Sequence, residues 1–214
     1  MKKILKMTAA ASMVGLLALA AAGCGGDKAA KNAVSADKVK FGVTNFADSL
    51  DPTDNYCSWA VIRYGLGETL VKFDDQMNAV PWLADKWSIS DDKLTWTFHI
   101  NDKVRFSNGD KLTAEIAKES IERTFKLNSR AQAMFQYDEI RAEGENLIIK
   151  TKTPVPTLPG MMGEPLFIII NTKVADRDLR KEGPICTGPY TVKSYSKAKA
   201  EMVANPKYWD GEVP

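Results

Sequence analysis

The clearest hydrophobic pattern lies between residues 93 and 100. Polar and apolar side chains alternate along this segment, and the apolar ones are Leu94, Trp96, Phe98 and Ile100. A period of two predicts a strand with one buried face and one solvated face. Asn101-Asp102 then forms a turn, and Val104 and Phe106 begin a second short alternation that stops at Asn108-Gly109. The pattern therefore predicts an antiparallel meander.

An amphipathic helix is predicted directly after this meander. Thr113 suits the N-cap position and Glu115 lies in the first turn, near the positive end of the helix dipole. Ala117, Ile121 and Phe125 then recur every four residues, which places them on one face of a helix.

The rest of the chain predicts short elements joined by turns. A hairpin is expected where Glu143-Gly144-Glu145 separates residues 139–142 from 146–152, and a fully buried strand is expected at 166–170. We expect further strands at 39–43, 69–73, 191–194 and 200–204, and short helices at 56–66, near 155 and at 174–181. Residues 79–87 read as a turn into the meander, and 128–136 as a loop or helix end. The mixture predicts an α/β fold (mixed α+β).

Composition permits a sizeable core but favours no charged partner. The chain has 214 residues, of which 44% are hydrophobic, enough for one or two domains. Its formal net charge is +2, and removal of the three lysines near the amino end leaves 26 basic and 27 acidic residues. We therefore expect no nucleic-acid partner.

The amino end resembles a bacterial lipoprotein signal. Lysines at positions 2, 3 and 6 precede a small, apolar run, and Ala21-Ala22-Gly23-Cys24 resembles the cleavage site. Residues 1–23 would be the signal peptide, Cys24 would carry the lipid, and residues 24–37 would form a flexible tether. Ala21 stands where such signals usually have leucine, so secretion without a lipid and an uncleaved anchor stay open. All three place the folded part outside the cytoplasm.

Catalytic and metal chemistry find little support in the sequence. His99 is the single histidine and lies on the polar face of its predicted strand, which favours a solvated side chain. No Gly-x-Ser-x-Gly motif is present, and Gly65-Leu-Gly67 lacks the third glycine of a dinucleotide site, so it reads as a helix terminus. Two distant cysteines and one histidine do not suggest a metal site. We expect neither an enzyme nor a resident cofactor.

Three blocks of sequence carry a family resemblance. They are W-x-x-S-D-D-x-L-T-W-T-F-x-I with V-R-F-S-N-G-D-x-L-T-A-E at 87–115; T-G-P-Y-T-V-K-S-Y at 187–195 with N-P-K-Y-W at 205–209; and L-D-P-T-D at 50–54 with E-T-L-V-K-F-D at 68–74. From about residue 38 onward, the chain resembles the family 5 extracellular solute-binding proteins, the oligopeptide-, dipeptide- and nickel-binding components of ABC importers.

This resemblance implies an architecture. Residues 38–79 and 172–214 would form a periplasmic-binding-protein type 2-like first lobe, and residues 80–171 an inserted α+β domain. The second lobe of the family is absent from the sequence. It also implies that the segments of Cys57 and Cys186 share one domain, where a disulfide and two free thiols are both open.

A cleft between lobes would hold the solute. The candidates to line it are aromatic and methionine residues in loops or at helix ends: Tyr56, Trp59, Met134, Phe135, Met161 and Met162. Such side chains suit a site that accepts varied solutes, although each of them also suits a hydrophobic core. The positions that hold an anionic chelate in nickel-binding members match Met134, Ala131 and Phe167, which carry no charge. Arg130 or Arg141 would have to compensate.

The function implied by the resemblance is solute capture for transport. The chain would bind a short peptide, or a nickel or metallophore complex as ligand, and deliver it to an ABC permease and its ATPase from the periplasm or cell surface, anchored to the membrane by lipid. A surface lipoprotein that senses or interacts without transport, and a non-functional truncated fragment, are the alternatives.

Overall fold

The computed structural model describes residues 39–40, 42–43 and 46–213. It divides the chain into two units, residues 1–42 and residues 43–214, and the second unit is described by itself below. The predicted signal peptide, the lipid-bearing Cys24 and the predicted tether lie outside the described residues.

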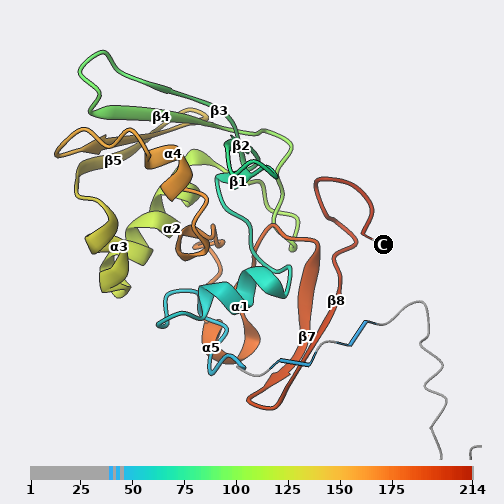
Figure 1. Ribbon diagram of the computed structural model, residues 1–214. Coiled ribbons are helices and arrows are strands. Elements are labelled where there is room, and N and C mark those ends of the chain that lie inside the picture. Colours follow the sequence, from blue (N-terminus) through green and yellow to red (C-terminus); the bar gives the residue numbers. More distant parts are fainter. Residues whose placement is uncertain (1–38, 41, 44–45, 214) are drawn as a thin grey trace, which may run out of the picture. The chain divides into compact units, whose positions relative to one another are not determined.

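An antiparallel sheet of four strands is the largest element of the 43–214 unit (Figure 1). Its order is β3-β4-β6-β5, formed by β3 (Ala84–Ile89), β4 (Thr95–Ile100), β6 (Asn146–Thr151) and β5 (Tyr137–Glu143). The predicted alternation in β4 is confirmed, because Trp96, Phe98 and Ile100 are buried. The predicted hairpin around Gly144 is confirmed as β5 and β6.

Helix α2 (Ala114–Leu127) covers this sheet, packing on β5 and β6. The predicted N-cap is confirmed, since the hydroxyl of Thr113 accepts a hydrogen bond from the backbone N–H of Ile116 at 3.3 Å. Ala117, Ile121 and Phe125 are buried, as their spacing predicts.

Two predicted features of the meander are wrong. Residues 104–106 form no strand; Arg105 makes an isolated bridge to Lys111, and β4 pairs instead with β3 and β6. Val104 and Phe106 are fully buried, so their alternation reflects burial rather than strand pairing. Residues 79–87 are not a turn but contain β2 (Ala79–Pro81) and the start of β3, in which Trp87 lies opposite Phe98.

Three other predicted elements differ from the structure. Residues 166–170 are buried, but they begin in a 3-10 turn (η1, Pro165–Phe167) and make one bridge, between Ile170 and Cys186. Pro165 starts this turn because its fixed φ suits a helical first position. Among residues 39–40 and 42–43 no strand forms, since none of them joins a ladder with a described strand. The helix expected at 174–181 is a single turn, α5 (Leu179–Glu182).

The remaining elements pack against the main core or around a smaller hydrophobic cluster. They are α1 (Ser58–Arg63), β1 (Val71–Phe73, paired with β2), α3 (Ser129–Met134), α4 (Leu158–Met161), β7 (Tyr190–Ser196) and β8 (Lys199–Ala204). The cluster contains Val61, Leu66, Ile168, Ile170 and Cys186. Whether residues 38–79 and 172–214 form one lobe around an inserted domain of 80–171 stays a prediction.

The predicted helix terminus at Gly65 is confirmed. Gly65 follows α1 with φ +67°, a conformation that glycine adopts without steric cost. The N–H of Leu66 donates to the carbonyl of Val61 at 3.1 Å, and the N–H of Gly65 to that of Ile62 at 3.0 Å. This Schellman arrangement satisfies the last carbonyls of the helix.

A buried ion pair ties the loop before α1 to α2. The guanidinium of Arg123 donates to Asp51 Oδ1 at 3.0 Å and also contacts Oδ2, while Thr53 donates to Oδ1 through its backbone N–H at 3.0 Å. Burial alone would raise the pKa of Asp51, but the hydrogen bonds from Arg123 and Thr53 outweigh it and hold the pKa below its ordinary value of 3.8. Asp51 is therefore held as an anion.

Replacing Arg123 with Met should lower the free energy of unfolding at neutral pH by about 1–3 kcal/mol, because the Asp51 carboxylate would remain buried without its cation. The side chain of Arg123 is 23% exposed, which keeps the loss below that of a fully buried pair. Urea unfolding measures it. Arg141→Met on β5 is the matched control, since Arg141 pairs with Glu139 at the surface and its loss should cost about 0–1 kcal/mol.

The ion pair of Asp51 and Arg123 should make the stability of the fold depend on pH. Because the folded-state pKa of Asp51 is lowered, its contribution is present above the unfolded value of 3.8 and is lost as the pH falls through the folded value. Wild type should therefore exceed Asp51→Asn in stability at neutral pH and lose that advantage below pH 3.8. An advantage that persists unchanged into strong acid would contradict this account.

Candidate functional site

A single asparagine fastens the loop before α1 to the start of α3. Asn128 ends α2 and caps α3, where its Oδ1 accepts from the backbone N–H of Arg130 at 3.0 Å. Its Nδ2 donates to the carbonyls of Thr53 at 3.0 Å and Asn55 at 3.1 Å. The residues that follow Asn55 are therefore held beside the first turn of α3.

This junction places an arginine against an exposed aromatic ring. The Cζ atom of Arg130 lies 4.1 Å from the ring centroid of Tyr56, whose side chain is 65% exposed. Nη2 of Arg130 lies 3.7 Å from Oε1 of Glu164, just before η1. Nη1 is buried and has no hydrogen-bond partner among the described residues. The guanidinium thus keeps donor capacity for another group.

A second aromatic ring lies one helical turn away. Trp59 on α1 is 38% exposed, and the Cζ atom of Arg63 lies 5.9 Å from its ring centroid. We call the set of Tyr56, Trp59, Arg63, Arg130 and Glu164 the Tyr56 surface. It combines aromatic faces with two guanidinium groups and one carboxylate, a composition suited to an amphipathic solute with an anionic group.

The other predicted cleft residues lie deeper. Phe135 and Met162 are buried in the main core, and Met134 and Met161 pack against that core while partly exposed. The ring of Phe135 meets that of Phe125 edge-on, with centroids 4.9 Å apart. Because they are buried, Phe135 and Met162 are not part of the Tyr56 surface in this conformation. They fit the alternative stated for each candidate, that it fills the hydrophobic core. Tyr56 and Trp59 remain predicted solute contacts.

Arg130 and Arg141, the two arginines considered as compensating charges, have different surroundings. Arg141 on β5 donates to Glu143 at 2.8 Å and to Glu139 at 3.1 Å, so two carboxylates already neutralise it. Arg130 lies at Tyr56, whereas Ala131 and Phe167, which the resemblance predicts at chelate-holding positions, are fully buried. Sequence reasoning missed Glu164, because no local pattern indicates that it approaches α3.

Cys57 and Cys186 are both free thiols in the structure. Of the two possibilities left open by the sequence, the structure therefore has the free thiols and not the disulfide. Cys57 is half-buried, and Cys186 is buried. Burial raises the pKa of each thiol, which makes both poor nucleophiles. His99 is not simply solvated, because its Nδ1 lies 2.8 Å from Oδ1 of Asp85.

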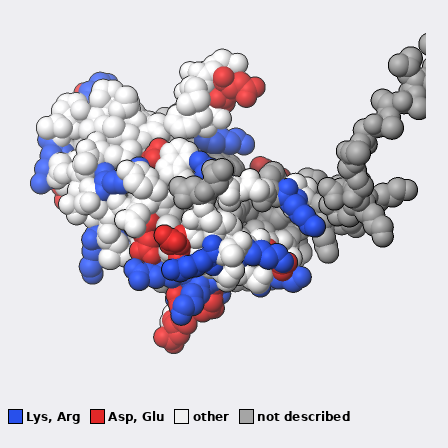
Figure 2. Space-filling view, turned by 60° about the horizontal axis from the view of Figure 1, so that its bottom comes forward, with Lys and Arg blue, Asp and Glu red and all other residues white. Residues whose placement is uncertain are grey.

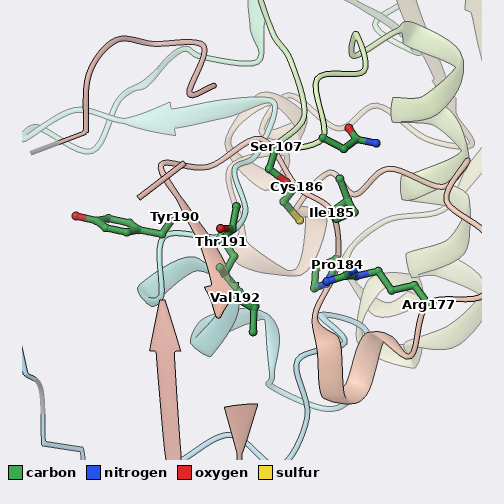
Figure 3. Close-up of a pocket in the computed structure, with 10 residues that line it drawn as sticks. Ser107, Arg177, Pro184, Ile185, Cys186, Tyr190, Thr191 and Val192 are labelled. Carbon is green, nitrogen blue, oxygen red and sulfur yellow. The ribbon is translucent and has the colours of Figure 1, made fainter. Parts of the chain in front are cut away.

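Two concavities of the described residues lie away from Tyr56 and Trp59. A cavity of about 200 Å³ lies beside β7, where Ser107, Arg177, Cys186 and Thr191 are among its lining residues (Figure 3). A hollow of about 370 Å³ beside α2 and α3 is lined by Phe125, Phe135 and Tyr137, among others. In residues 39–40, 42–43 and 46–213, no three His, Cys, Asp or Glu side chains gather as a metal site would require.

Charges of both signs lie side by side on the face shown in Figure 2. Surface ion pairs of the described residues include that of Arg180 Nε with Asp54 Oδ2 at 2.8 Å. Within the described part of the chain, no helix has the length and apolar character needed to cross a membrane.

Comparison with known proteins gives a consistent set of relatives. The model of bacterial extracellular solute-binding proteins, family 5 Middle, matches residues 78–214. The nickel-binding protein NikA of Staphylococcus aureus is 32% identical over 152 residues, which cover 71% of this chain and 30% of that protein. The dipeptide-binding protein of Lactococcus lactis is 27% identical over 206 residues, which cover 80% of this chain and 37% of that protein.

Solved structures agree with these relatives. The crystal structure of a nickel ABC transporter protein from Bacillus halodurans matches with a TM-score of 0.72 and 34% identity, over 78% of this chain and 35% of the other. The fold is a mixed α/β fold that resembles the type 2 periplasmic binding proteins, and the chain spans about a third of the length of the proteins it matches. This chain therefore belongs to the family 5 bacterial extracellular solute-binding proteins.

Proposed function

We propose that the chain contributes to the solute-binding component of an ABC importer, and that the Tyr56 surface contacts a small solute that carries a carboxylate. The component would hand its solute to a permease driven by an ATPase, and no catalytic step is involved. Family membership supports the transport role. The observation that carries the solute class is Arg130, whose side chain is 32% exposed, lies over the ring of Tyr56 and approaches Glu164 only to 3.7 Å.

Arg130 suits a carboxylate for three physical reasons. Its guanidinium presents paired N–H groups that match the two oxygens of a carboxylate. Its position over the ring of Tyr56, with Cζ 4.1 Å from the centroid, restrains the side chain before binding, so less rotamer freedom is lost. Glu164, at 3.7 Å, is too distant for a short hydrogen bond and neutralises the charge only in part.

Both solute types named for the relatives can meet this requirement. A short peptide ends in a carboxylate, and a nickel ion chelated by amino or carboxylic acids presents carboxylate oxygens around the metal. The exposed rings of Tyr56 and Trp59 would contact the apolar parts of either solute, because aromatic contacts are broad rather than directional. A nickel complex would be cargo rather than a resident cofactor.

Replacing Arg130 with Gln should weaken solute binding by about 10- to 100-fold, because a charge-assisted hydrogen bond to the solute is lost. Isothermal titration of the purified chain measures the affinity for two probes, a nickel–histidine mixture and a mixed tripeptide pool. Whichever probe binds identifies the solute type. Arg141→Gln is the matched control and should bind like wild type, because Arg141 already pairs with Glu139 and Glu143.

A second arm tests the carboxylate itself. Peptides capped as carboxy-terminal amides should bind wild type more weakly than free peptides, whereas Arg130→Gln should bind the two forms about equally. For the nickel probe, histidine is exchanged for histidinamide. Equal affinity of wild type and Arg130→Gln for the free acid would refute the assignment of Arg130.

We further propose that the mature chain is held at the outer side of a membrane by lipid on Cys24. The supports are the basic start, the small apolar run and the Ala21-Ala22-Gly23-Cys24 sequence. A single anchor followed by a Gly-, Ala- and Lys-rich tether would leave the 43–214 unit free to meet a permease.

Expression in a bacterial host tests this anchor. Wild type should incorporate labelled palmitate and enter the detergent phase on Triton X-114 partition, whereas Cys24→Ser should do neither. Cys57→Ser is the control and should behave like wild type, because Cys57 lies beyond the signal. Wild-type protein recovered in the aqueous phase without label would instead indicate secretion without lipid.

A further inference from the structure

A buried glutamate lies where three distant segments meet. Glu68, just before β1, is 1% exposed. The hydroxyl of Tyr208 donates to its Oε1 at 2.7 Å, and the indole N–H of Trp209 donates to its Oε2 at 2.8 Å. Both carboxyl oxygens are therefore occupied by side chains about 140 residues further along the chain.

Backbone hydrogen bonds join the same three segments. The N–H of Gly188 donates to the carbonyl of Leu66 at 3.0 Å, and that of Asn205 donates to Pro189 at 2.8 Å. The amide of Asn205, itself buried, donates to the carbonyl of Gly188 at 3.0 Å. Gly188 permits this approach, since a Cβ there would lie 2.4 Å from the carbonyl oxygen of Gly65. Residues 65–68, 187–190 and 205–209 thus form one junction, with Glu68 inside it.

The surroundings of Glu68 offer hydrogen bonds from neutral side chains. Among the ion pairs of the described residues, none involves Glu68. The groups that act most on its titration are the donors Trp209 and Tyr208, the nearby hydroxyl of Thr187, which makes no hydrogen bond to any described residue, and the negatively charged Asp210. The thiol of Cys186 also senses Glu68, and burial keeps that thiol protonated.

Burial therefore decides how Glu68 titrates. It raises the pKa of Glu68, Asp210 raises it further, and the hydrogen bonds from Trp209 and Tyr208 lower it without cancelling the effect of burial, so the pKa lies above its ordinary value of 4.5. A charged Glu68 costs more in the folded chain than in the unfolded chain.

We infer that Glu68 is a proton-sensitive anchor, which takes up a proton from solution as the medium acidifies and thereby stabilises the folded junction of residues 65–68, 187–190 and 205–209. The proton binds Oε1. Trp209 can only donate, so it keeps its hydrogen bond to Oε2, which becomes the carbonyl oxygen. The new O–H donates to Tyr208, whose hydroxyl can accept as well as donate. Family 5 proteins are extracellular, so the anchor would respond to the pH outside the cell.

The test compares wild type with Glu68→Gln, which keeps an acceptor for Trp209 and a donor for Tyr208 but cannot be charged. Thermal unfolding of the whole chain is followed from pH 4.5 to pH 8. Because the folded pKa is raised, the contribution of Glu68 is fully present below 4.5 and is lost as the pH rises through the folded value. The Tm of wild type minus that of the variant should therefore fall by a few °C as the pH rises.

Glu139→Gln serves as the matched control. Glu139 is an exposed carboxyl on β5, and its removal should leave the Tm difference from wild type unchanged over the same range. A wild-type minus Glu68→Gln difference that stays constant or grows with pH would overturn the proposal, because it would mean that Glu68 is held as an anion.

A second readout covers the case in which Glu68→Gln does not fold. Infrared spectroscopy of wild type should detect the carbonyl stretch of a buried protonated carboxyl at a pH where exposed carboxyls are ionised. Trp209→Phe removes an N–H that favours the charged form, so the midpoint of that band should move to higher pH. Absence of the band from wild type at every pH where exposed carboxyls are ionised would exclude a protonated Glu68, and an unmoved midpoint in Trp209→Phe would exclude Trp209 as a group that tunes it.

Discussion

The buried pair of Asp51 and Arg123 holds the candidate site together. It fixes a loop that has no regular secondary structure to α2, the helix that covers the main sheet. Asn128, at the end of the same helix, binds the loop a few residues later. Because the loop is bound at both ends, the ring of Tyr56 is held beside the guanidinium of Arg130. The position of an exposed ring is thus set by polar contacts that lie largely inside the protein.

A similar logic explains why three separated blocks of sequence belong together. The blocks around residues 68, 187 and 205 contain little that marks them as neighbours, yet they converge on Glu68 and on backbone hydrogen bonds of Gly188 and Asn205. The glutamate, the glycine and the aromatic donors fit one geometry. Without Gly188 the segments could not approach this closely, and without Tyr208 and Trp209 the buried Glu68 would lack its hydrogen-bond donors. The resemblance to the family therefore rests partly on a structural junction and not on solute contacts alone.

Local patterns could be predicted from the sequence, and long-range choices could not. The spacing in α2 and the alternation in β4 depend on neighbours a few residues away, so both elements could be predicted from the sequence. Nothing local indicates that β4 pairs with β6, some 50 residues later, rather than with residues 104–106. The candidate site divides in the same way. Tyr56 and Trp59 are exposed, but Phe135 and Met162 are core residues, because burial is decided by what packs against them.

The two buried carboxyls show how surroundings decide charge. Asp51 has an arginine beside it, so its pKa is lowered and its contribution to stability disappears in strong acid. Glu68 has hydrogen-bond donors but no ion pair among the described residues, so its pKa is raised and its contribution declines toward neutral and alkaline pH. Together they favour the folded chain most in mildly acidic conditions, between the two titrations. Neutral donors can orient a buried carboxylate, but in this protein a cation is needed to keep it charged at little cost.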